Sequence, residues 1–415
     1  MNNIVLIAPP FSGHLHPILG IAQELIKTGE YNITIVSTKS VKNKVLAVGN
    51  INFYSILDDY EQIIEEIANP NCFVKSNPLK MFNQLKQNIL VLKYAKKELK
   101  NILELIKPNC VISDFTITIT GLVCEELKIK WLTTLPSPCV YETKNGVPAY
   151  LGGLKPSSNF FIKLKYKGYN QFIRLMKKTF FRIFSKELKE IGFNSLYRKD
   201  GSEIIYSNTK VFALGLKKLE FNNHPYEFFQ YIGPILYTPN VENNDEILFD
   251  FSKEKKNILV TFGTHLKFFK KDVIEYFTKF CAENKQYNIH ISLGDDKVKS
   301  IEKIHNNLNV YSFIPYNKYL KEYDVIIHHG GSGIMYECIK YGKPSIVFPQ
   351  DYDQFDNAAR IEYANLGVRV KNFKDVIVAL EKIQKMDNFK YFLSKYQKIL
   401  VNSNPINSII EELDN

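Results

Sequence analysis

The sequence contains few cysteines, and none is spaced as in a metal site or a redox pair. Six occur in 415 residues, with no C-x-x-C pair and no His–Cys ligand spacing: Cys72, Cys110, Cys124, Cys139, Cys281 and Cys338. Several lie in apolar runs such as NCVISD, where a free thiol behaves as a small core residue. A structural zinc site and a disulfide framework are therefore not expected, and a reducing compartment is favoured.

The start of the chain lacks the pattern of a targeting segment. MNN carries no basic residue, and IVLIAPP is too short for the apolar part of a signal peptide or for a membrane span. Together with the cysteine usage, this predicts a cytoplasmic location.

Acidic residues are outnumbered, but the excess of basic residues has no nucleic-acid pattern. The formal net charge is +11 and the isoelectric point is near 9.0, which would suit acidic partners. The lysines are dispersed, however, and no nucleic-acid recognition motif is present. A solvated, lysine-rich surface explains the charge, and we expect no nucleic-acid partner.

The chain is long enough for two domains, and its first half alternates strand-like and helix-like segments. Helices are expected to begin near Pro17, Pro78 and Thr118. Five Val-, Ile- or Thr-rich runs predict buried strands: NIVLIAP, NITIVST, INFYSIL, NCVISDF and IKWLTTLP. This alternation predicts a parallel sheet with crossover helices, a Rossmann-like α/β domain covering residues 1–235.

The same alternation restarts in the second half and predicts a second Rossmann-like domain over residues 257–389. Its strand candidates are KNILVTFG, YNIHISLG, LNVYSFIP, VIIHHGG and PSIVFPQ. The polar, turn-rich residues 236–256 read as the linker. Residues 390–415 predict two helices that return to the first domain. Two such domains would face each other across a cleft at the carboxyl ends of their sheets.

Residues 160–184 mix lysines, arginines and many aromatics, and no acidic residue occurs before Glu187. We favour a solvated helix that covers the sheet, with Phe and Leu facing inward and Lys outward. The alternative is an interfacial amphipathic helix, a peripheral membrane contact on anionic lipid.

The strongest local pattern is VIIHHGGSGIMYECIKYGKP. A buried strand ends at His328-His329, a glycine-rich turn covers residues 330–333, and a helix follows. Such a turn lets a phosphate group approach the backbone at a helix N-terminus. His329 could donate a hydrogen bond to a pyrophosphate oxygen. The alternative is a structural histidine at the strand end, hydrogen-bonded within the protein. The third glycine of GxGxxG and the GK[ST] of a P-loop are both absent, which disfavours a hydride-transfer cofactor.

Further polar residues are expected along the same rim of the sheet. Asp353 and Gln354 follow the next strand, and an acid beside an amide suits hydrogen bonding to neighbouring sugar hydroxyls. Glu337, one turn into the helix, could accept hydrogen bonds from the vicinal hydroxyls of a ribose. Phosphate-, ribose- and hexose-binding groups along one rim predict a nucleotide-sugar ligand.

These motifs resemble those of family 1 glycosyltransferases, the UDP-glycosyltransferase superfamily. The donor signature of that family is similar to two consecutive motifs here, HHGG-S-G-x-x-x-E and FPQ-x-x-DQ-x-x-NA. The similarity is greatest to the bacterial macrolide, polyketide and carotenoid branch. Near the start of the chain, GHLHP resembles the family's GHxxP opening. The resemblance spans essentially the whole chain and is weak only between about residues 60 and 230. It implies a GT-B fold, with two Rossmann-like domains and a C-terminal helix packed on the N-terminal one.

The resemblance implies that His14 is the general base and that Asp114, at the end of NCVISD, is its partner. Neutral imidazole suits removal of a proton from an attacking hydroxyl, a contribution of about 10²–10⁴-fold. The positive end of a helix penalises the imidazolium, and a carboxylate partner corrects this. His16 is expected to be structural.

The resemblance also implies roles for residues along the C-terminal rim. Gly263 and Thr264 would contact the β-phosphate, Phe313 would stack on uracil, and the Ile314 backbone would bind the base. The diphosphate would lie against His329, Gly331, Ser332 and Gly333. One departure is Ile334, which replaces the usual Ser or Thr and should cost about 0.5–1.5 kcal/mol of donor affinity.

The sequence therefore predicts inverting, metal-independent hexose transfer, most simply from UDP-glucose, to a small lipophilic acceptor with a hydroxyl. No DxD pair lies beside the phosphate turn, so we expect neither an essential metal nor a further cofactor. Two alternatives remain open: transfer to a membrane lipid, and a non-catalytic nucleotide-sugar-binding helper.

Overall fold

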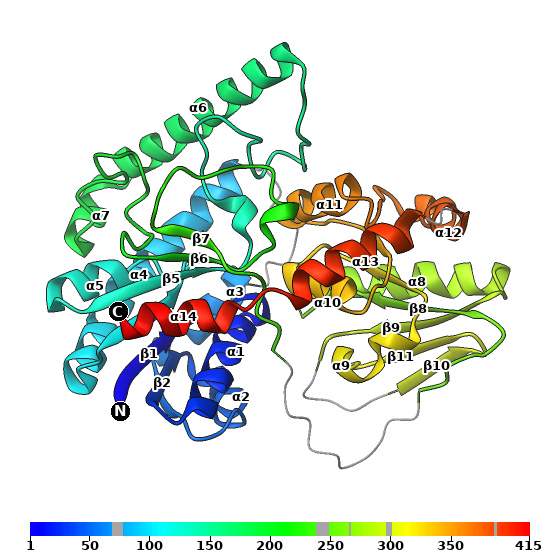
Figure 1. Cartoon of the computed structure of the whole chain (residues 1–415), viewed down its shortest axis with the longest axis horizontal. Coiled ribbons are helices and arrows are strands. Elements are labelled where there is room, and N and C mark those ends of the chain that lie inside the picture. Colours follow the sequence, from blue (N-terminus) through cyan, green and yellow to red (C-terminus); the bar gives the residue numbers. More distant parts are fainter. Residues whose placement is uncertain (69–77, 238–248, 265–266, 296–300, 386–387) are drawn as a thin grey trace.

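The computed structural model describes residues 1–415 apart from 69–77, 238–248, 265–266, 296–300 and 386–387. Two α/β domains stand side by side, each built on a seven-stranded sheet with helices on both faces (Figure 1). The two-domain Rossmann-like architecture predicted from the sequence is confirmed. Most of the predicted linker lies outside the described residues.

The sheet of the N-terminal domain is entirely parallel, in the order β3-β2-β1-β4-β5-β6-β7. All five predicted strands are present, and two three-residue strands, too short for a periodic signal, were missed. The strands are β1 (Asn2–Ile7), β2 (Tyr31–Ser37), β3 (Asn52–Ser55), β4 (Cys110–Asp114), β5 (Lys130–Leu135), β6 (Val211–Ala213) and β7 (Phe229–Tyr231).

The first helix begins earlier than predicted. Helix α1 starts at Ser12 rather than near Pro17, because the Phe11 carbonyl already accepts from the backbone N–H groups of His14 and Leu15. The remaining helices of this domain are α2 (Lys42–Leu46), α3 (Glu61–Ala68), α4 (Pro78–Ile106), α5 (Thr120–Leu127), α6 (Phe160–Ile183) and α7 (Ser185–Ile191), and α1 ends at Thr28. His14 consequently lies in the first turn of a helix.

The sheet of the C-terminal domain has the order β10-β11-β9-β8-β12-β13-β14, with one antiparallel pair, β10 and β11. The five predicted strands are again present, and β10 and β14 were missed. The strands are β8 (Lys256–Thr261), β9 (Tyr287–Ser292), β10 (Ile301–His305), β11 (Leu308–Tyr311), β12 (Val325–His328), β13 (Ser345–Val347) and β14 (Gly367–Arg369). The helices are α8 (Lys267–Glu283), α9 (Tyr316–Tyr319), α10 (Ser332–Lys340), α11 (Gln354–Tyr363), α12 (Val376–Lys385), α13 (Asn388–Val401) and α14 (Pro405–Asp414).

The two C-terminal helices pack on different domains, which corrects the prediction that both return to the first one. Helix α13 contacts α10 and buries Phe389 and Leu393 in the core of the C-terminal domain. Helix α14 lies on the N-terminal domain, where Ile409 packs into the core beside α1 (Figure 1).

The order of the strands decides which loops can form a site. In the first sheet β1 is hydrogen-bonded to β4, and in the second β12 lies between β8 and β13. Because these strands are parallel, the residues that follow them gather at one edge of each sheet. Within the described ranges, no helix is both long and apolar enough to cross a membrane.

Candidate active site

A histidine–carboxylate pair joins the carboxyl ends of β1 and β4. The Nδ1 atom of His14 lies 3.1 and 3.0 Å from the two carboxylate oxygens of Asp114. The Asp114 side chain is fully buried and also accepts from the backbone N–H of Thr116 at 2.9 Å and from its hydroxyl. With Nδ1–H donated to Asp114, the lone pair of His14 is on Nε2, as a general base requires.

Two opposing effects set the pKa of His14. Burial lowers it, but the negative charge of Asp114, its hydrogen bond and the charge of Asp353 outweigh burial and raise the pKa above the usual 6.5. A protonated His14 ring is therefore stabilised, and the ring remains reachable because the side chain is 28% exposed.

Aromatic rings surround His14, whereas His16 faces another part of the molecule. The ring of Phe115 lies 5.7 Å from the His14 ring, and that of Phe11 lies 6.4 Å away in an edge contact. The His16 ring lies 5.6 Å from Tyr237 instead. The structure thus separates the two histidines of GHLHP as the sequence predicted.

On the C-terminal side, two glycines make room for the ring of His329. A Cβ added to Gly263 would lie 2.9 Å from its Cε1 atom, and one added to Gly331 would lie 2.6 Å from its Nε2 atom. Gly263 also has φ +70°, which disfavours other residues. Gly331 caps helix α10, which begins with Ser332 and Gly333 and has no side-chain cap. This leaves its first N–H groups available to an anion.

Glu337, on the same helix, is buried with one oxygen unsatisfied. Its Oε2 atom has no hydrogen bond, and the ammonium of Lys340, 3.9 Å away, is too distant to provide one. Burial raises the pKa of Glu337 above its usual value, although Lys340 lowers it. A buried carboxylate oxygen without a donor suits a ligand that supplies hydroxyl groups.

The segment after β11 provides one accessible aromatic ring. Phe313 is partly exposed, whereas Ile314 is fully buried in a core cluster with Leu320 and Ile334. The side chain of Ile334 therefore packs in the core and does not line the start of α10. This burial favours a packing role for Ile334 over that of a missing phosphate ligand, and the expected cost to donor affinity stays a prediction.

Two predicted sugar-binding residues already have protein partners. The Asp353 carboxylate accepts from Ser137 Oγ of the N-terminal domain at 2.5 Å and from Asn357 Nδ2 at 3.2 Å. The Gln354 side-chain oxygen accepts from two backbone N–H groups, those of Gln350 and Asp351. A bound sugar would therefore meet the Asp353 carboxylate, which is bonded to the opposite domain, and the Gln354 amide, which is held by the backbone of its own loop.

The edges of the two sheets meet through contacts between the domains. Thr264 Oγ1 lies 3.4 Å from Ser12 Oγ. Farther out, Arg360 and Glu220 form a 2.8 Å ion pair in which both side chains are almost fully buried. These contacts bring the predicted His14–Asp114 pair and the predicted C-terminal residues to one interdomain junction.

Sequence reasoning missed three residues at this junction: Ser12, Thr116 and Ser137. Each lies within two residues of a strand end or of a residue that was predicted. Treating every polar residue after β1, β4 and β5 as a candidate would have found them, since parallel strands end at one edge.

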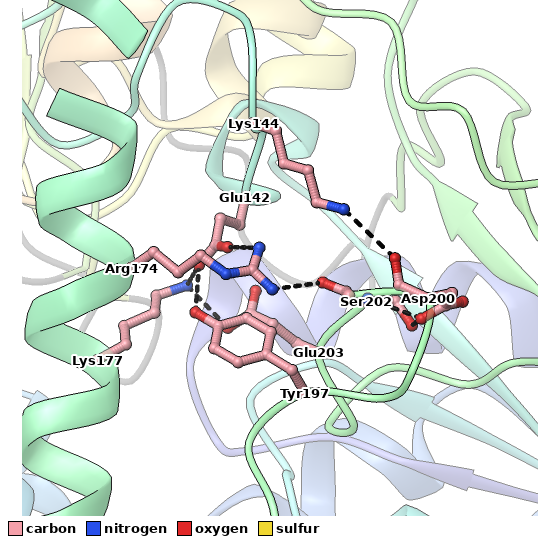
Figure 2. A network of polar contacts seen from close by, with 9 residues as sticks. Glu142, Lys144, Arg174, Lys177, Tyr197, Asp200, Ser202 and Glu203 are labelled. Atoms are coloured by element: carbon pink, nitrogen blue, oxygen red, sulfur yellow. Dashed lines mark hydrogen bonds and ion pairs between the residues drawn. The ribbon is translucent and has the colours of Figure 1, made fainter. Parts of the chain in front are cut away.

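A buried polar network within the N-terminal domain holds helix α6 against the rest of that domain (Figure 2). The Glu142 carboxylate accepts from Arg174 at 3.0 Å, and it pairs with Lys177 at 3.0 Å. Lys177 also donates to Glu203 at 2.7 Å, and Tyr197 donates to Glu142 at 2.8 Å. A cavity of about 200 Å³ lies beside the network.

Comparison with known proteins places the chain among glycosyltransferases. The model of the glycosyltransferase family 28 C-terminal domain matches residues 257–412. An uncharacterized UDP-glucosyltransferase, YojK of Bacillus subtilis (strain 168), is 24% identical over 410 residues, 96% of this chain and 93% of that protein. UDP-glucuronosyltransferase 3A1 of Xenopus laevis is 26% identical over 66% of this chain, which spans about half (54%) of that relative.

A solved structure agrees over the whole chain. The glycotransferase of kitacinnamycin superposes with a TM-score of 0.76 at 18% identity, covering 99% of both chains. The fold of this structure, the relatives that match along the whole chain and the residues on both sides of the interdomain junction all indicate a glycosyltransferase. The chain is a glycosyltransferase of the GT-B fold, and over almost its whole length it is similar to UDP-glycosyltransferases.

Proposed function

We propose that the protein transfers a hexose from a UDP-sugar to a hydroxyl of a small lipophilic acceptor, with inversion at the anomeric carbon. The observation that carries this proposal is the His14–Asp114 pair at 3.0 Å, located where the edges of the two sheets meet. His14 Nε2 would take the proton of the acceptor hydroxyl as its oxygen attacks, and Asp114 would stabilise the resulting imidazolium.

The C-terminal rim would bind the donor. The uncapped start of α10 and His329 would hold the diphosphate and stabilise the charge that develops as it leaves, so the proposed mechanism uses no metal. The 2′- and 3′-hydroxyls of a ribose would satisfy the unbonded oxygen of Glu337, which favours UDP over thymidine diphosphate with its single ribose hydroxyl. Phe313 would stack on the base.

The sugar and the acceptor are assigned from the remaining contacts. Asp353 and Gln354 favour a hexose with free 3- and 4-hydroxyls, such as glucose. The aromatic rings of Phe11 and Phe115 beside His14 favour an apolar acceptor. The intact His14–Asp114 pair disfavours the alternative of a non-catalytic nucleotide-sugar-binding helper.

A donor panel tests the proposal. UDP-glucose, UDP-galactose, UDP-glucuronate and dTDP-glucose would be compared by thermal shift, because one solved neighbour, SsfS6 of Streptomyces sp. SF2575, was crystallised with thymidine diphosphate. A mixed-acceptor assay read by mass spectrometry would follow, with EDTA present in one arm. We expect UDP-glucose to give the largest shift and a β-linked product, unaffected by EDTA. A product that retains the donor's configuration, or activity lost in EDTA, would contradict the mechanism.

A further inference from the structure

Helix α6 buries a mixed face and leaves several large apolar side chains exposed. On the inner face Asn170 donates to the Gly146 carbonyl at 2.9 Å, and Arg174 and Lys177 enter the buried Glu142–Glu203 network (Figure 2). Phe181 packs against the core on the same side. The arrangement favoured from the sequence, with Phe and Leu inward and Lys outward, therefore holds only in part, because several Phe and Leu side chains face outward beside the lysines.

Five exposed apolar side chains share one outward face of the helix, interspersed with Lys165 and Arg182, and we call this face the α6 stripe. Its members are 55–77% exposed and, at 100° per residue, fall within an arc of roughly 100°: Phe161, Leu164, Phe172, Leu175 and Ile183. Figure 1 shows α6 along the outer edge of the N-terminal domain, away from both sheets. Nothing in the described chain covers this stripe.

The charge on α6 has one sign. The helix carries five lysines and two arginines and no acidic residue. Arg174 and Lys177 are neutralised by the inner network, which leaves five cations without an ion pair among the described residues: Lys163, Lys165, Lys167, Lys178 and Arg182. Lys165 and Arg182 lie within the arc of the stripe, and Lys167 and Lys178 follow one flank of it.

We propose that the α6 stripe docks the protein on the surface of an anionic phospholipid bilayer. Five exposed apolar side chains would enter the acyl boundary, and the lysine and arginine stems would let their charged heads reach the lipid phosphates. The unbroken positive charge suits an anionic surface, whereas docking with a second copy would bring two such helices, with like charges, face to face. The inner ion-pair network keeps the helix formed and oriented before it binds.

Vesicle flotation of the full chain, without donor or acceptor, tests the docking independently of glycosyl transfer. We expect binding to vesicles of phosphatidylcholine with 30% phosphatidylglycerol, little binding to phosphatidylcholine alone, and weaker binding when salt rises from 0.1 to 0.5 M. The double variant Phe172→Ser/Leu175→Ser should bind at least tenfold more weakly. Lys167→Gln/Lys178→Gln should lose roughly fivefold per charge.

Two matched controls separate the stripe from general surface effects. Leu105→Ser/Val378→Ser removes equally exposed apolar residues on α4 and α12, and Lys382→Gln/Lys395→Gln removes distant charges; both should bind vesicles like the parent. Unchanged thermal unfolding would show that every variant is folded. Equal binding to both lipid mixtures, no binding to either, or self-association by light scattering that Phe172→Ser/Leu175→Ser abolishes would overturn the proposal.

Discussion

On the N-terminal side of the junction the Asp114 carboxylate accepts from both His14 and Thr116, whereas on the C-terminal side a Glu337 oxygen is buried with no hydrogen bond. The first group is complete without a ligand. The second group lacks a hydrogen-bond donor for Glu337 and a side-chain cap for the start of α10. We infer a division of labour: the N-terminal side is a preorganised base, and the C-terminal side gains its missing partners from the donor.

Removing the charge of Asp114 should have the largest effect among the following four changes. Asp114→Asn should lower kcat about 10²-fold or more, because the imidazolium loses its stabilising carboxylate. The pKa of His14 should fall, since Asp114 raises it, so the acidic limb of the pH profile of kcat/KM should move to lower pH. A limb that stays in place would show that Asp114 does not act through His14.

Ile334→Ser separates core packing from donor binding. If Ile334 belongs to the core cluster, this change should lower the free energy of unfolding by about 2–4 kcal/mol, measured in urea, and leave UDP affinity within about twofold. The milder Ile334→Val should cost about 0.5–1.5 kcal/mol. Tighter UDP binding by the serine variant would restore the interpretation of a lost phosphate ligand.

Glu337→Gln should weaken UDP binding about tenfold, because the ribose hydroxyls lose a charged acceptor. Calorimetry should show that the variant no longer distinguishes UDP from 2′-deoxy-UDP. The exposed Glu381→Gln on α12 is the control and should bind UDP normally. If Glu337→Gln bound UDP more weakly but still distinguished UDP from 2′-deoxy-UDP, the ribose would not contact Glu337.

The same residue predicts a pH effect on stability in the absence of ligand. Because the pKa of Glu337 is raised in the folded state, the unfolded chain loses this proton first as pH rises. Its contribution is therefore present below the usual pKa near 4.5 and is lost as pH rises through the higher folded value. Glu337→Gln should remove that part of the slope, and an unchanged slope would contradict the raised pKa.

Ser137→Ala should have the smallest effect. It removes the hydrogen bond from Ser137 to Asp353 and should lower the free energy of unfolding by about 0.5–1.5 kcal/mol. We expect kcat to stay within threefold, since Asp353 remains in place for the sugar. A tenfold fall in kcat would show that Ser137 itself contacts the substrate.

The sequence predicted the features that depend on local pattern. Alternating apolar runs predicted ten strands, and the resemblance to family 1 glycosyltransferases predicted the pairing of His14 with Asp114. Signals were too weak for the three-residue strands β6, β7 and β14. The start of α1 was misplaced because Pro17, a residue type favoured at the start of a helix, lies inside a helix that begins at Ser12.

What the sequence did not predict depends on tertiary contacts. Periodicity showed that α6 has two faces but not which one the protein covers, and the buried acids Glu142 and Glu203 hold Lys177 on the inner face. Motif alignment located Ile334 but not the direction of its side chain. The pairs Ser137–Asp353 and Arg360–Glu220 join segments more than a hundred residues apart, which no local pattern relates.

The most direct test measures kcat and UDP affinity together in His14→Ala, with His16→Ala as the matched control. The division of labour predicts that His14→Ala lowers kcat by about 10²–10⁴-fold while its Kd for UDP stays within twofold of the parent. His16→Ala, whose ring faces Tyr237 and not Asp114, should keep both values. Full turnover in His14→Ala would contradict the account.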